Sequence, residues 1–347
     1  MHDLILSFFY LVFIYLVNNI FLNNNFLPNY TGQIHQKYSG FKKIPLSGGF
    51  FFTFFVTIIF FKFSPLLSLF IFFIFLTGIV SDLDLVKSPK FRFFIQFLLI
   101  TTFVIIFEIK IFPTRFIMLD ILLSNIYVSF AFSIFCLLVL INGSNFIDGL
   151  NGLLLGYFIL ILLIIFYLSN FANLDILINK KHILNLAIIL FILLVFNFRN
   201  KLFMGDSGAY SLSFVLGYLL IKTYEMNQFI SPYFIVLLLW YPCFENLFSI
   251  IRKFTFRRSP LNPDNNHFHQ LLFHFLKKKL ILKKININNL TSVSILLYNF
   301  SIFSLSLIDI KNSQLQILLI FINIFVYLRI YYGLFFYKNN KYLGKKD

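Results

Sequence analysis

Polar side chains gather in the segment NGSNFIDGLNG, which begins at Asn142 and separates two apolar runs. On a helix, the side chains of Asn142, Asn145 and Asp148 recur every three residues and form one polar stripe. The Asn145 amide oxygen and the Asp148 carboxylate are ligands that suit a hard divalent cation. Gly149 and Gly152 break the helix and let a substrate approach the backbone. The alternative interpretation is a helix C-cap followed by an N-cap.

The segment LFMGDSGAY places two glycines around Asp206 and Ser207, directly before an expected helix. Free N–H groups and the positive end of the helix dipole favour an anion at such a start. Asp206 with Mg²⁺ could hold a diphosphate there, because Mg²⁺ takes one or two protein carboxylates and fills its shell with phosphate and water. The alternative is that Asp206 or Ser207 only caps the helix.

Two further segments combine charged or titratable side chains. In GIVSDLDLVKSPKFR, Asp82 lies near Lys90 and Arg92, either as an ordinary mixed-charge loop or as part of a site. In SPLNPDNNHFHQLL, His267 and His269 point the same way if the segment is extended and opposite ways if it is helical. Zinc needs at least three protein ligands and no third is evident. The histidines therefore favour a pair that grips a phosphate or a base.

The composition predicts the elements that must position these residues. Of 347 residues, 59% are hydrophobic and 12% charged, with a mean hydropathy of +0.87; soluble domains average about 25% charged. Apolar runs of about 15–20 residues predict helices that cross a bilayer. The expected fold is an all-α, polytopic membrane protein that forms a single domain over 1–347. We expect eleven spans at 4–22, 47–61, 65–81, 92–108, 125–142, 153–169, 182–198, 208–223, 232–251, 293–309 and 315–333.

The distribution of basic residues predicts the orientation. The formal net charge is +16, and threading the spans puts roughly three-quarters of the Lys and Arg residues on one side, which the positive-inside rule assigns to the cytosol. The N-terminus is then outside, the C-terminus is cytosolic, and the polar segments described above all face the cytosol. The charge therefore indicates topology and attraction to anionic lipid rather than nucleic-acid binding. The apolar and basic rhythm of 271–284 favours a helix on the inner membrane surface.

With these segments together, the sequence resembles the polyprenyl-phosphate N-acetylhexosamine-1-phosphate transferases, a superfamily that includes the phospho-N-acetylmuramoyl-pentapeptide transferase of peptidoglycan synthesis. NxxNxxDGxNG and FMGDSG are specific in combination. The PDxxHxH form of the histidine loop resembles the bacterial branch that starts O-antigen and related envelope polymers. The resemblance covers residues 30–275 and rests on His35 with Ile44–Gly49, Gly78–Arg92, Asn142–Leu153, Asn197–Gly208 and Ser259–Leu272.

The resemblance implies roles for residues of this sequence. Asn145 and Asp206 match metal-binding positions for Mg²⁺, with Mn²⁺ as the alternative cation. The implied catalytic residues are Asp82, Asp148, Asp206, His267 and His269. The implied substrate-binding residues are Asn142, Lys90, Arg92, Asn197, Arg252 and Lys253.

Three positions deserve comparison with the family pattern. Ser81 stands where the family usually has the first of two aspartates, and Asn151 stands where it has the second acid of DGxDG. Glu245 is the acid that the family often carries after the proline of the ninth span. The loss of an acid at 81 would matter if it were the sole proton acceptor for a lipid phosphate. A phosphate monoester has its second pKa near about 6, however, and is mostly a dianion at neutral pH.

The resemblance thus implies a Mg²⁺-dependent transferase of the bacterial inner membrane. It would move an N-acetylhexosamine 1-phosphate from a UDP-sugar to a polyprenyl (undecaprenyl) phosphate, release UMP and start a cell-envelope polysaccharide such as O-antigen. A membrane transporter or lipid flippase, or an inactive relative that acts as a scaffold, is the alternative. The sequence leaves open the sugar, the lipid length, a homodimer, and one-step or covalent transfer.

Overall fold

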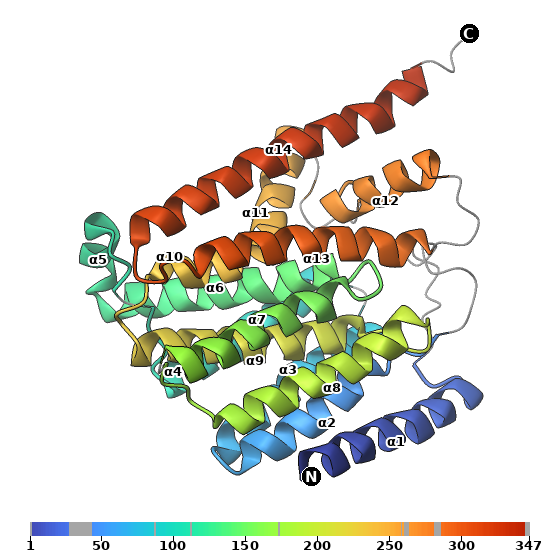
Figure 1. The fold of residues 1–347 in the computed structure, drawn as a ribbon, viewed down its shortest axis with the longest axis horizontal. Coiled ribbons are helices and arrows are strands. Elements are labelled where there is room, and N and C mark those ends of the chain that lie inside the picture. Colours follow the sequence, from blue (N-terminus) through green and yellow to red (C-terminus); the bar gives the residue numbers. More distant parts are fainter. Residues whose placement is uncertain are drawn as a thin grey trace.

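The computed structural model describes residues 2–27, 44–86, 88–111, 113–172, 174–257, 259, 264–280 and 286–343, and within them it contains helices and no β-strand. The all-α prediction is therefore confirmed for the described part of the chain (Figure 1). The helices are α1 (His2–Asn23), α2 (Gly48–Phe61), α3 (Pro65–Asp82), α4 (Pro89–Ile106), α5 (Ile117–Leu123), α6 (Ile126–Ile147), α7 (Leu153–Phe171), α8 (Lys180–Phe198), α9 (Gly205–Met226), α10 (Pro232–Leu238), α11 (Trp240–Thr255), α12 (Phe268–Lys279), α13 (Ile287–Ser306) and α14 (Ser313–Leu343).

Seven of the described helices are long and apolar enough to cross a membrane: α1, α3, α4, α6, α7, α8 and α14. Together they make the protein a multi-pass membrane protein. Large apolar side chains stay exposed on outward faces, among them Phe72, Phe97, Phe321 and Phe325, as expected where lipid rather than water surrounds a helix. Each of the eleven predicted spans overlaps a described helix. Their number and their orientation in the bilayer stay predictions.

The predicted span 232–251 is wrong as one continuous helix. The chain bends by 75° between α10 and α11, at Leu239. Pro242 lies in the first turn of α11, where its missing N–H is tolerated, whereas inside a continuous helix it would remove a hydrogen bond and clash with the preceding turn. The bend separates α11 from the axis of α10 (Figure 1) and sends Arg252 and Lys253 toward the histidine loop.

Two local predictions are confirmed. The tight hairpin expected between the second and third spans is present, because α2 ends at Phe61 and α3 begins at Pro65, with the Ser64 hydroxyl accepting from the Leu67 N–H at 3.2 Å. The basic helical segment expected over 271–284 is helical as far as Lys279, where α12 ends with Leu280 in extended conformation; its position on the inner membrane surface stays a prediction. Residues 281–285, at its far end, lie outside the described residues.

Helix α9 runs through the middle of the bundle and packs against α2, α3 and α6. Close contact at its beginning requires glycine on its neighbours. A Cβ on Gly78 of α3 would lie 2.1 Å from the Ser207 Cα, and a Cβ on Gly49 of α2 would lie 2.4 Å from the Gly208 nitrogen. Because no other residue lacks the Cβ, these glycines let the ends of α2 and α3 meet the first turn of α9. The start of α2 and the end of α3 therefore both lie against the start of α9.

Candidate active site

The first turn of α9 is capped by a carboxylate from α3. The Asp206 N–H donates to Asp82 Oδ1 at 2.8 Å, and the Ser207 N–H donates to Asp82 Oδ2 at 3.1 Å. The anion that the helix start was predicted to attract is, in the first place, Asp82 itself. Gly205 makes this approach feasible: its φ is +71°, and a Cβ there would lie 2.7 Å from Asp82 Oδ2. Asp82 is thereby fixed beside Asp206.

Asp206 points away from its own helix start toward α3 and α4. Its carboxylate accepts a short hydrogen bond from the Ser81 hydroxyl, and Arg92 Nη1 lies 3.3 Å from Asp206 Oδ2. The Arg92 guanidinium also donates to the Ser81 hydroxyl oxygen. Ser81 therefore links the base to the acid. An aspartate in its place would put a second carboxylate directly against Asp206, so the serine lowers the negative charge at this point.

Asn145 and Asp206, the two predicted metal ligands, come together around a tyrosine. Asn145 Nδ2 lies 3.4 Å from the Tyr210 hydroxyl, and the same hydroxyl lies 3.4 Å from Asp206 Oδ2. Asn145 belongs to α6 and Asp206 to α9, so the two ends face each other. Sequence reasoning missed Tyr210, although its position one turn after Asp206 on the same helix face was a usable signal.

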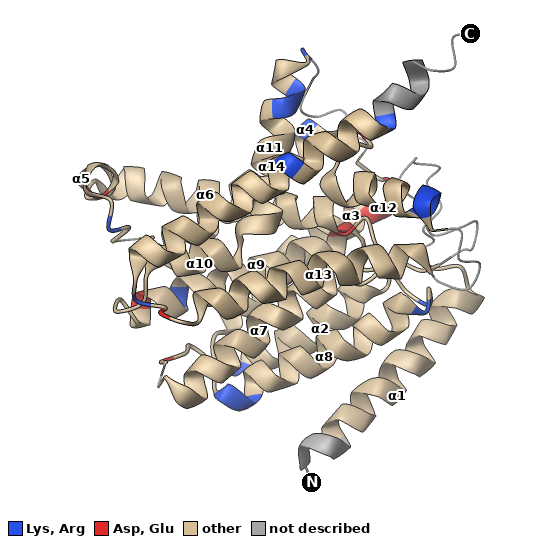
Figure 2. Ribbon diagram, turned by 45° about the horizontal axis from the view of Figure 1, so that its top comes forward, with Lys and Arg blue, Asp and Glu red and all other residues tan. Residues whose placement is uncertain are grey.

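Asp148 adds a third carboxylate at the end of α6. Burial, followed by the charges of Asp206 and Asp82, raises its pKa well above the ordinary value, and the Gly205 backbone opposes the shift only in part. The acids are therefore close enough to repel one another. Among the described residues, Arg92 is the basic side chain in ion-pair contact with Asp206. Figure 2 shows acidic positions near the labels of α3 and α12, within the bundle.

The donor set fits a partial site for a hard cation. Within the described ranges, no three His, Cys, Asp or Glu side chains lie so as to enclose a metal by themselves. Mg²⁺ does not need such a cage, because it usually combines one or two carboxylates with phosphate oxygens and water. The Asn145 amide and the Asp206 carboxylate supply hard oxygen ligands. The pKa of Asp148 is raised first by burial and then by the charges of Asp206 and Asp82, and a cation would favour the ionised form of these acids.

The histidine loop, residues 264–269, contacts the end of α6. His267 is the N-cap of α12 with extended backbone, whereas His269 lies inside the helix. Their rings nevertheless stack, with centroids 5.8 Å apart and planes 12° apart. The His267 ring also packs on the Phe146 ring, with centroids 4.9 Å apart. Phe146 directly follows Asn145, a member of the polar stripe. The loop and the stripe are thus in direct contact.

His269 is completely buried beside the glycine turn after α6. A Cβ on Gly149 would lie 2.7 Å from His269 Nε2, and neither ring nitrogen has a hydrogen-bond partner among the described residues. Burial, and then the charge of His267, lowers the pKa of His269 to about 3. The imidazole is therefore neutral at physiological pH and keeps one donor and one acceptor. It can serve a substrate by hydrogen bonding but carries no charge.

Arg252 and Lys253 stand at the end of α11, next to the loop. Arg252 binds Asp264 through both terminal nitrogens, at 2.6 and 3.3 Å. Burial opposes ionisation of Asp264, but the Arg252 hydrogen bond and the charges of His267 and Arg252 outweigh it and lower the pKa of the carboxyl. Lys253 lies 6.0 Å from the centre of the Phe146 ring. Arg252 is thus committed to Asp264, and Lys253 lies against the motif of α6.

The other predicted substrate-binding residues make contacts of different kinds. Asn197 accepts from the Gly152 N–H at 2.5 Å and donates to the Leu202 carbonyl at 3.0 Å, so it braces the two glycine-containing loops. Asn142 donates back to the Leu138 carbonyl at 2.9 Å and contacts Gln96 at 3.4 Å. Lys90 is exposed in the first turn of α4. His35, part of the resemblance, lies outside the described residues.

Asn151, the other departure from the family pattern, connects three segments of the chain by hydrogen bonds. Its Nδ2 donates to Asn200 Oδ1 at 2.7 Å and to Asn289 Oδ1 at 3.3 Å, while its backbone N–H donates to Asn288 Oδ1 at 2.7 Å. Both side-chain partners are acceptors, so this position needs a donor. An aspartate cannot donate when ionised. Asn151 therefore ties the turn after α6 to α13 and to the loop before α9.

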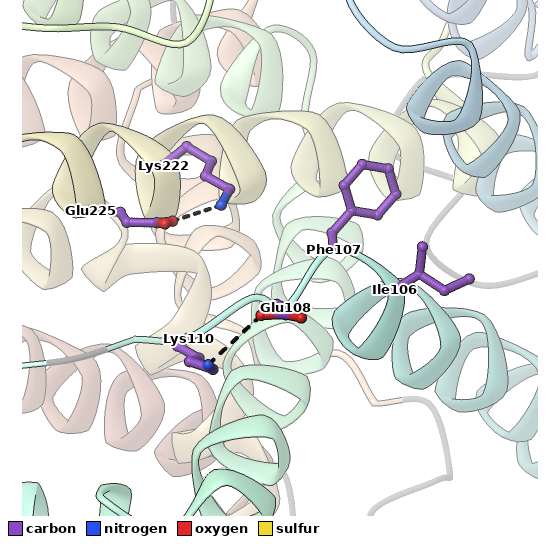
Figure 3. A pocket seen from close by; sticks show the side chains of 6 residues that line it. All are labelled: Ile106, Phe107, Glu108, Lys110, Lys222 and Glu225. Carbon is purple, nitrogen blue, oxygen red and sulfur yellow. Dashed lines mark hydrogen bonds and ion pairs between the residues drawn. The ribbon is translucent and has the colours of Figure 1, made fainter.

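A hollow of about 530 Å³ lies at the opposite end of α9 and is lined by Ile106, Phe107, Glu108, Lys110, Lys222 and Glu225 (Figure 3). Its charges are paired: Lys222 Nζ lies 2.7 Å from Glu225 Oε2, and Lys110 Nζ lies 4.0 Å from Glu108 Oε2. None of the predicted site residues lines it. The hollow therefore offers a balanced charge, unlike the acidic centre at the start of the helix.

The fold and the site define a multi-pass α-helical membrane protein whose helix ends bring acids, an amide, an arginine and a histidine loop together. Residues 64–224 match the family model for glycosyl transferase family 4. This stretch runs from the start of α3 to the end of α9 and contains Asp82, Asn145, Asp148 and Asp206. Over this segment the chain is similar to that family, in agreement with the resemblance found in the sequence.

Curated relatives agree with this placement. The chain is similar to a probable undecaprenyl-phosphate N-acetylglucosaminyl 1-phosphate transferase of Bacillus subtilis, with 29% identity over 53% of this chain and 49% of the relative. It is also similar to a decaprenyl-phosphate N-acetylglucosaminephosphotransferase of Mycolicibacterium smegmatis, with 30% identity over 38% of this chain and 37% of the relative. An undecaprenyl-phosphate alpha-N-acetylglucosaminyl 1-phosphate transferase of Thermotoga maritima shares 28% identity over 38% and 39%. The matches span about half, or less, of these relatives.

Proposed function

We propose that the protein transfers an N-acetylhexosamine 1-phosphate from a UDP-sugar to a polyprenyl phosphate and releases UMP. The reaction would take place at the cytosolic face of a bacterial inner membrane and would start a cell-envelope polysaccharide such as O-antigen. The names of the similar proteins support an acceptor of this kind. The observation that carries the proposal is the meeting of Asn145 and Asp206, from different helices, at one tyrosine hydroxyl.

Both substrates are anions, so the protein must let two phosphate groups approach each other. Asn145 and Asp206 would hold Mg²⁺, which, when bound, supplies positive charge to the diphosphate of the donor. Arg92, 3.3 Å from Asp206, adds a fixed positive charge at the same place. Asp82 acts indirectly in this scheme, because its hydrogen bonds to the first turn of α9 fix the direction of Asp206.

In the transfer step, an oxygen of the lipid phosphate bonds to the sugar-linked phosphorus of the donor. The bond between that phosphorus and the bridging oxygen breaks, and UMP leaves with the oxygen. A phosphate monoester is mostly a dianion above its second pKa of about 6, so the acceptor needs no enzymic base at neutral pH. Ser81, in the place of a family acid, is compatible with such a step.

The histidine loop would bind the donor. His269, neutral and buried against Gly149, offers one hydrogen-bond donor and one acceptor. His267 lies at the start of α12, beside the aromatic ring that follows Asn145. Lys253, next to the same ring, adds positive charge. These three side chains approach the acidic centre from one side, and we assign them to the phosphates or the base of the nucleotide.

A panel assay tests the proposal. The purified protein in detergent would receive undecaprenyl phosphate and, in separate reactions, UDP-sugars that carry different N-acetylhexosamines. We expect UMP and a lipid-linked product in equal amounts with at least one donor, and neither when the lipid phosphate is omitted. A complete lack of UMP release with every donor would contradict the proposal. That result would favour the alternative of a lipid flippase. The movement of a labelled polyprenyl phosphate across the bilayer of vesicles that contain the protein would test it.

A further inference from the structure

The last helix, α14, is hydrogen-bonded to the histidine loop. The Tyr331 hydroxyl donates to the Asn266 carbonyl at 2.9 Å. Lys338 Nζ donates to the Asn265 carbonyl and to Asn266 Oδ1, each at 2.8 Å. Tyr331 and Lys338, together with Tyr327, come from one side of α14, close to whole turns apart. This helix lies outside the segment that matches the family model, so its contacts are evident from the structure alone.

A buried carboxylate joins α14 to the first histidine. Glu245, on α11, is 1% exposed. Its Oε1 lies 2.9 Å from His267 Nδ1 and accepts from the Phe268 N–H at 3.3 Å, while its Oε2 accepts from the Tyr327 hydroxyl at 2.7 Å. Both oxygens of Glu245 are therefore engaged. Desolvating a carboxylate is costly, and an apolar residue would suffice if this position only filled the core.

The two partners of His267 fix the orientation of its ring. Nδ1 faces Glu245, and Nε2 lies 3.6 Å from Asp264 Oδ1. The state of one imidazole nitrogen is set by the bond that the other makes. The His267 ring packs on Phe146, which follows Asn145 in the sequence. A change in the orientation of His267 would therefore alter the packing beside Asn145. The contact path thus runs from α14 to the acidic centre.

We propose that Tyr327 and Glu245 are positioning residues that hold His267, and with it the loop 264–269, in the orientation that binds the nucleotide donor. The inference rests on the proposed function, because it assigns the loop to the UDP-sugar. It adds that α14, beyond the matched family segment, determines donor affinity. Neither residue touches the donor in this account; both act through His267.

The test compares two tyrosine-to-phenylalanine variants that each remove one interhelical hydroxyl. Tyr327→Phe keeps the ring that packs on Phe268 at 4.9 Å and removes only the bond to Glu245. Tyr298→Phe is the matched control, because the Tyr298 hydroxyl donates to Asn323 of α14 at 2.6 Å, away from the loop. We expect Tyr327→Phe to raise the KM for the UDP-sugar about three- to tenfold, an effect typical of the net contribution of one intramolecular hydrogen bond.

The split between kinetic constants separates positioning from simple loss of stability. For Tyr327→Phe we expect the KM for the lipid phosphate and the kcat to stay within about twofold of wild type. Tyr298→Phe should leave all three constants within the same limit. The inference is overturned if Tyr327→Phe leaves the donor KM at the value of the control, or if it changes only the kcat.

Binding of UDP, measured by calorimetry on the detergent-purified protein, gives a readout that does not depend on turnover. Tyr327→Phe and Glu245→Gln should each weaken UDP binding in the wild-type background, and neither should weaken it further once His267→Ala is present. Additive losses in that double variant would contradict action through His267. A wild-type protein that binds UDP with this pattern but releases no UMP would sink the proposed function and leave the positioning role intact.

Discussion

Both ends of α9 carry charged side chains, but these charges are paired at one end and mostly acidic at the other. At the C-terminal end, Lys222 pairs with Glu225 at 2.7 Å, and Lys110 lies 4.0 Å from Glu108 (Figure 3). At the N-terminal end, Asp206 gathers with Asp82 and Asp148, with Arg92 as its ion-pair partner. Pairing makes the first end electrostatically balanced. The second end keeps an excess of negative charge.

Such an excess is costly at a membrane boundary unless a function maintains it. Burial, and then the charges of Asp206 and Asp82, raise the pKa of Asp148 at this end. The glycines around the start of α9 bring the backbones close enough to place these acids side by side. The comparison shows that charge is paired at one end of α9 and that acids gather at the other, where the proposed function places a cation and anionic substrates. Four substitutions examine this account.

The largest effect is expected from Asp206→Asn. The change removes the carboxylate that contacts Ser81, Arg92 and Tyr210, so UMP release should fall by at least about a hundredfold, the loss typical of a group that stabilises transition-state charge. Glu225→Gln, the same change at the balanced end of α9, should stay within about twofold of wild type. Equal activity in the two variants would remove the distinction between the ends. If the protein were a scaffold, Asp206→Asn would leave its assembly with partners unchanged.

Gly205→Ala tests the close approach of Asp82. The residue has a φ of +71°, and the new Cβ would lie 2.7 Å from the Asp82 carboxylate, so the capping geometry must shift. Backbone strain of this kind costs on the order of 1–3 kcal/mol, and thermal unfolding in detergent would measure it together with a decrease in activity. Gly333→Ala is the control, because a Cβ there meets nothing within 4 Å; it should be neutral or slightly stabilising.

Asn151→Asp tests whether the departure from the family pattern is structural. An ionised aspartate would face the acceptor oxygens of Asn200 and Asn289 without a proton to donate. We expect a loss of about 1–3 kcal/mol in the free energy of unfolding, the cost of unsatisfied buried polar groups. Equal or greater stability would show that these hydrogen bonds are unimportant and that the family acid is tolerated here.

The sequence was sufficient for the all-helical class and the tight turn before Pro65, because apolar runs and turn residues have local signatures. It also singled out Asn145 and Asp206, which both lie near the Tyr210 hydroxyl, while their sharing of a cation stays a prediction. It was not sufficient for the partners of those residues. The capping of α9 by Asp82 depends on how closely α3 packs, and the contact of Tyr327 with Glu245 joins residues 82 positions apart. The bend before Trp240 was also missed, although Pro242 offered a signal.

The smallest effect concerns pH and Asp148. A carboxyl whose pKa is raised on folding stabilises the protein fully below its ordinary value of 3.8, and this contribution is lost as pH rises through the folded pKa. Asp148→Asn removes the dependence. The melting temperature of the variant should therefore exceed that of wild type by a few degrees, about 2–4 °C, at neutral pH, and the difference should shrink toward pH 4. A difference that does not change with pH would contradict the raised pKa of Asp148.

The most direct test of the central claim is UMP release from a UDP-N-acetylhexosamine by the purified protein with undecaprenyl phosphate. Release is measured after chelation of divalent cations and again after addition of Mg²⁺. Wild type and Asp206→Asn are compared under the same conditions. The account predicts that wild-type release stops on chelation and returns with Mg²⁺, while Asp206→Asn stays inactive at every concentration. Release that persists in wild type after complete chelation, or that Mg²⁺ restores equally in both proteins, would contradict it.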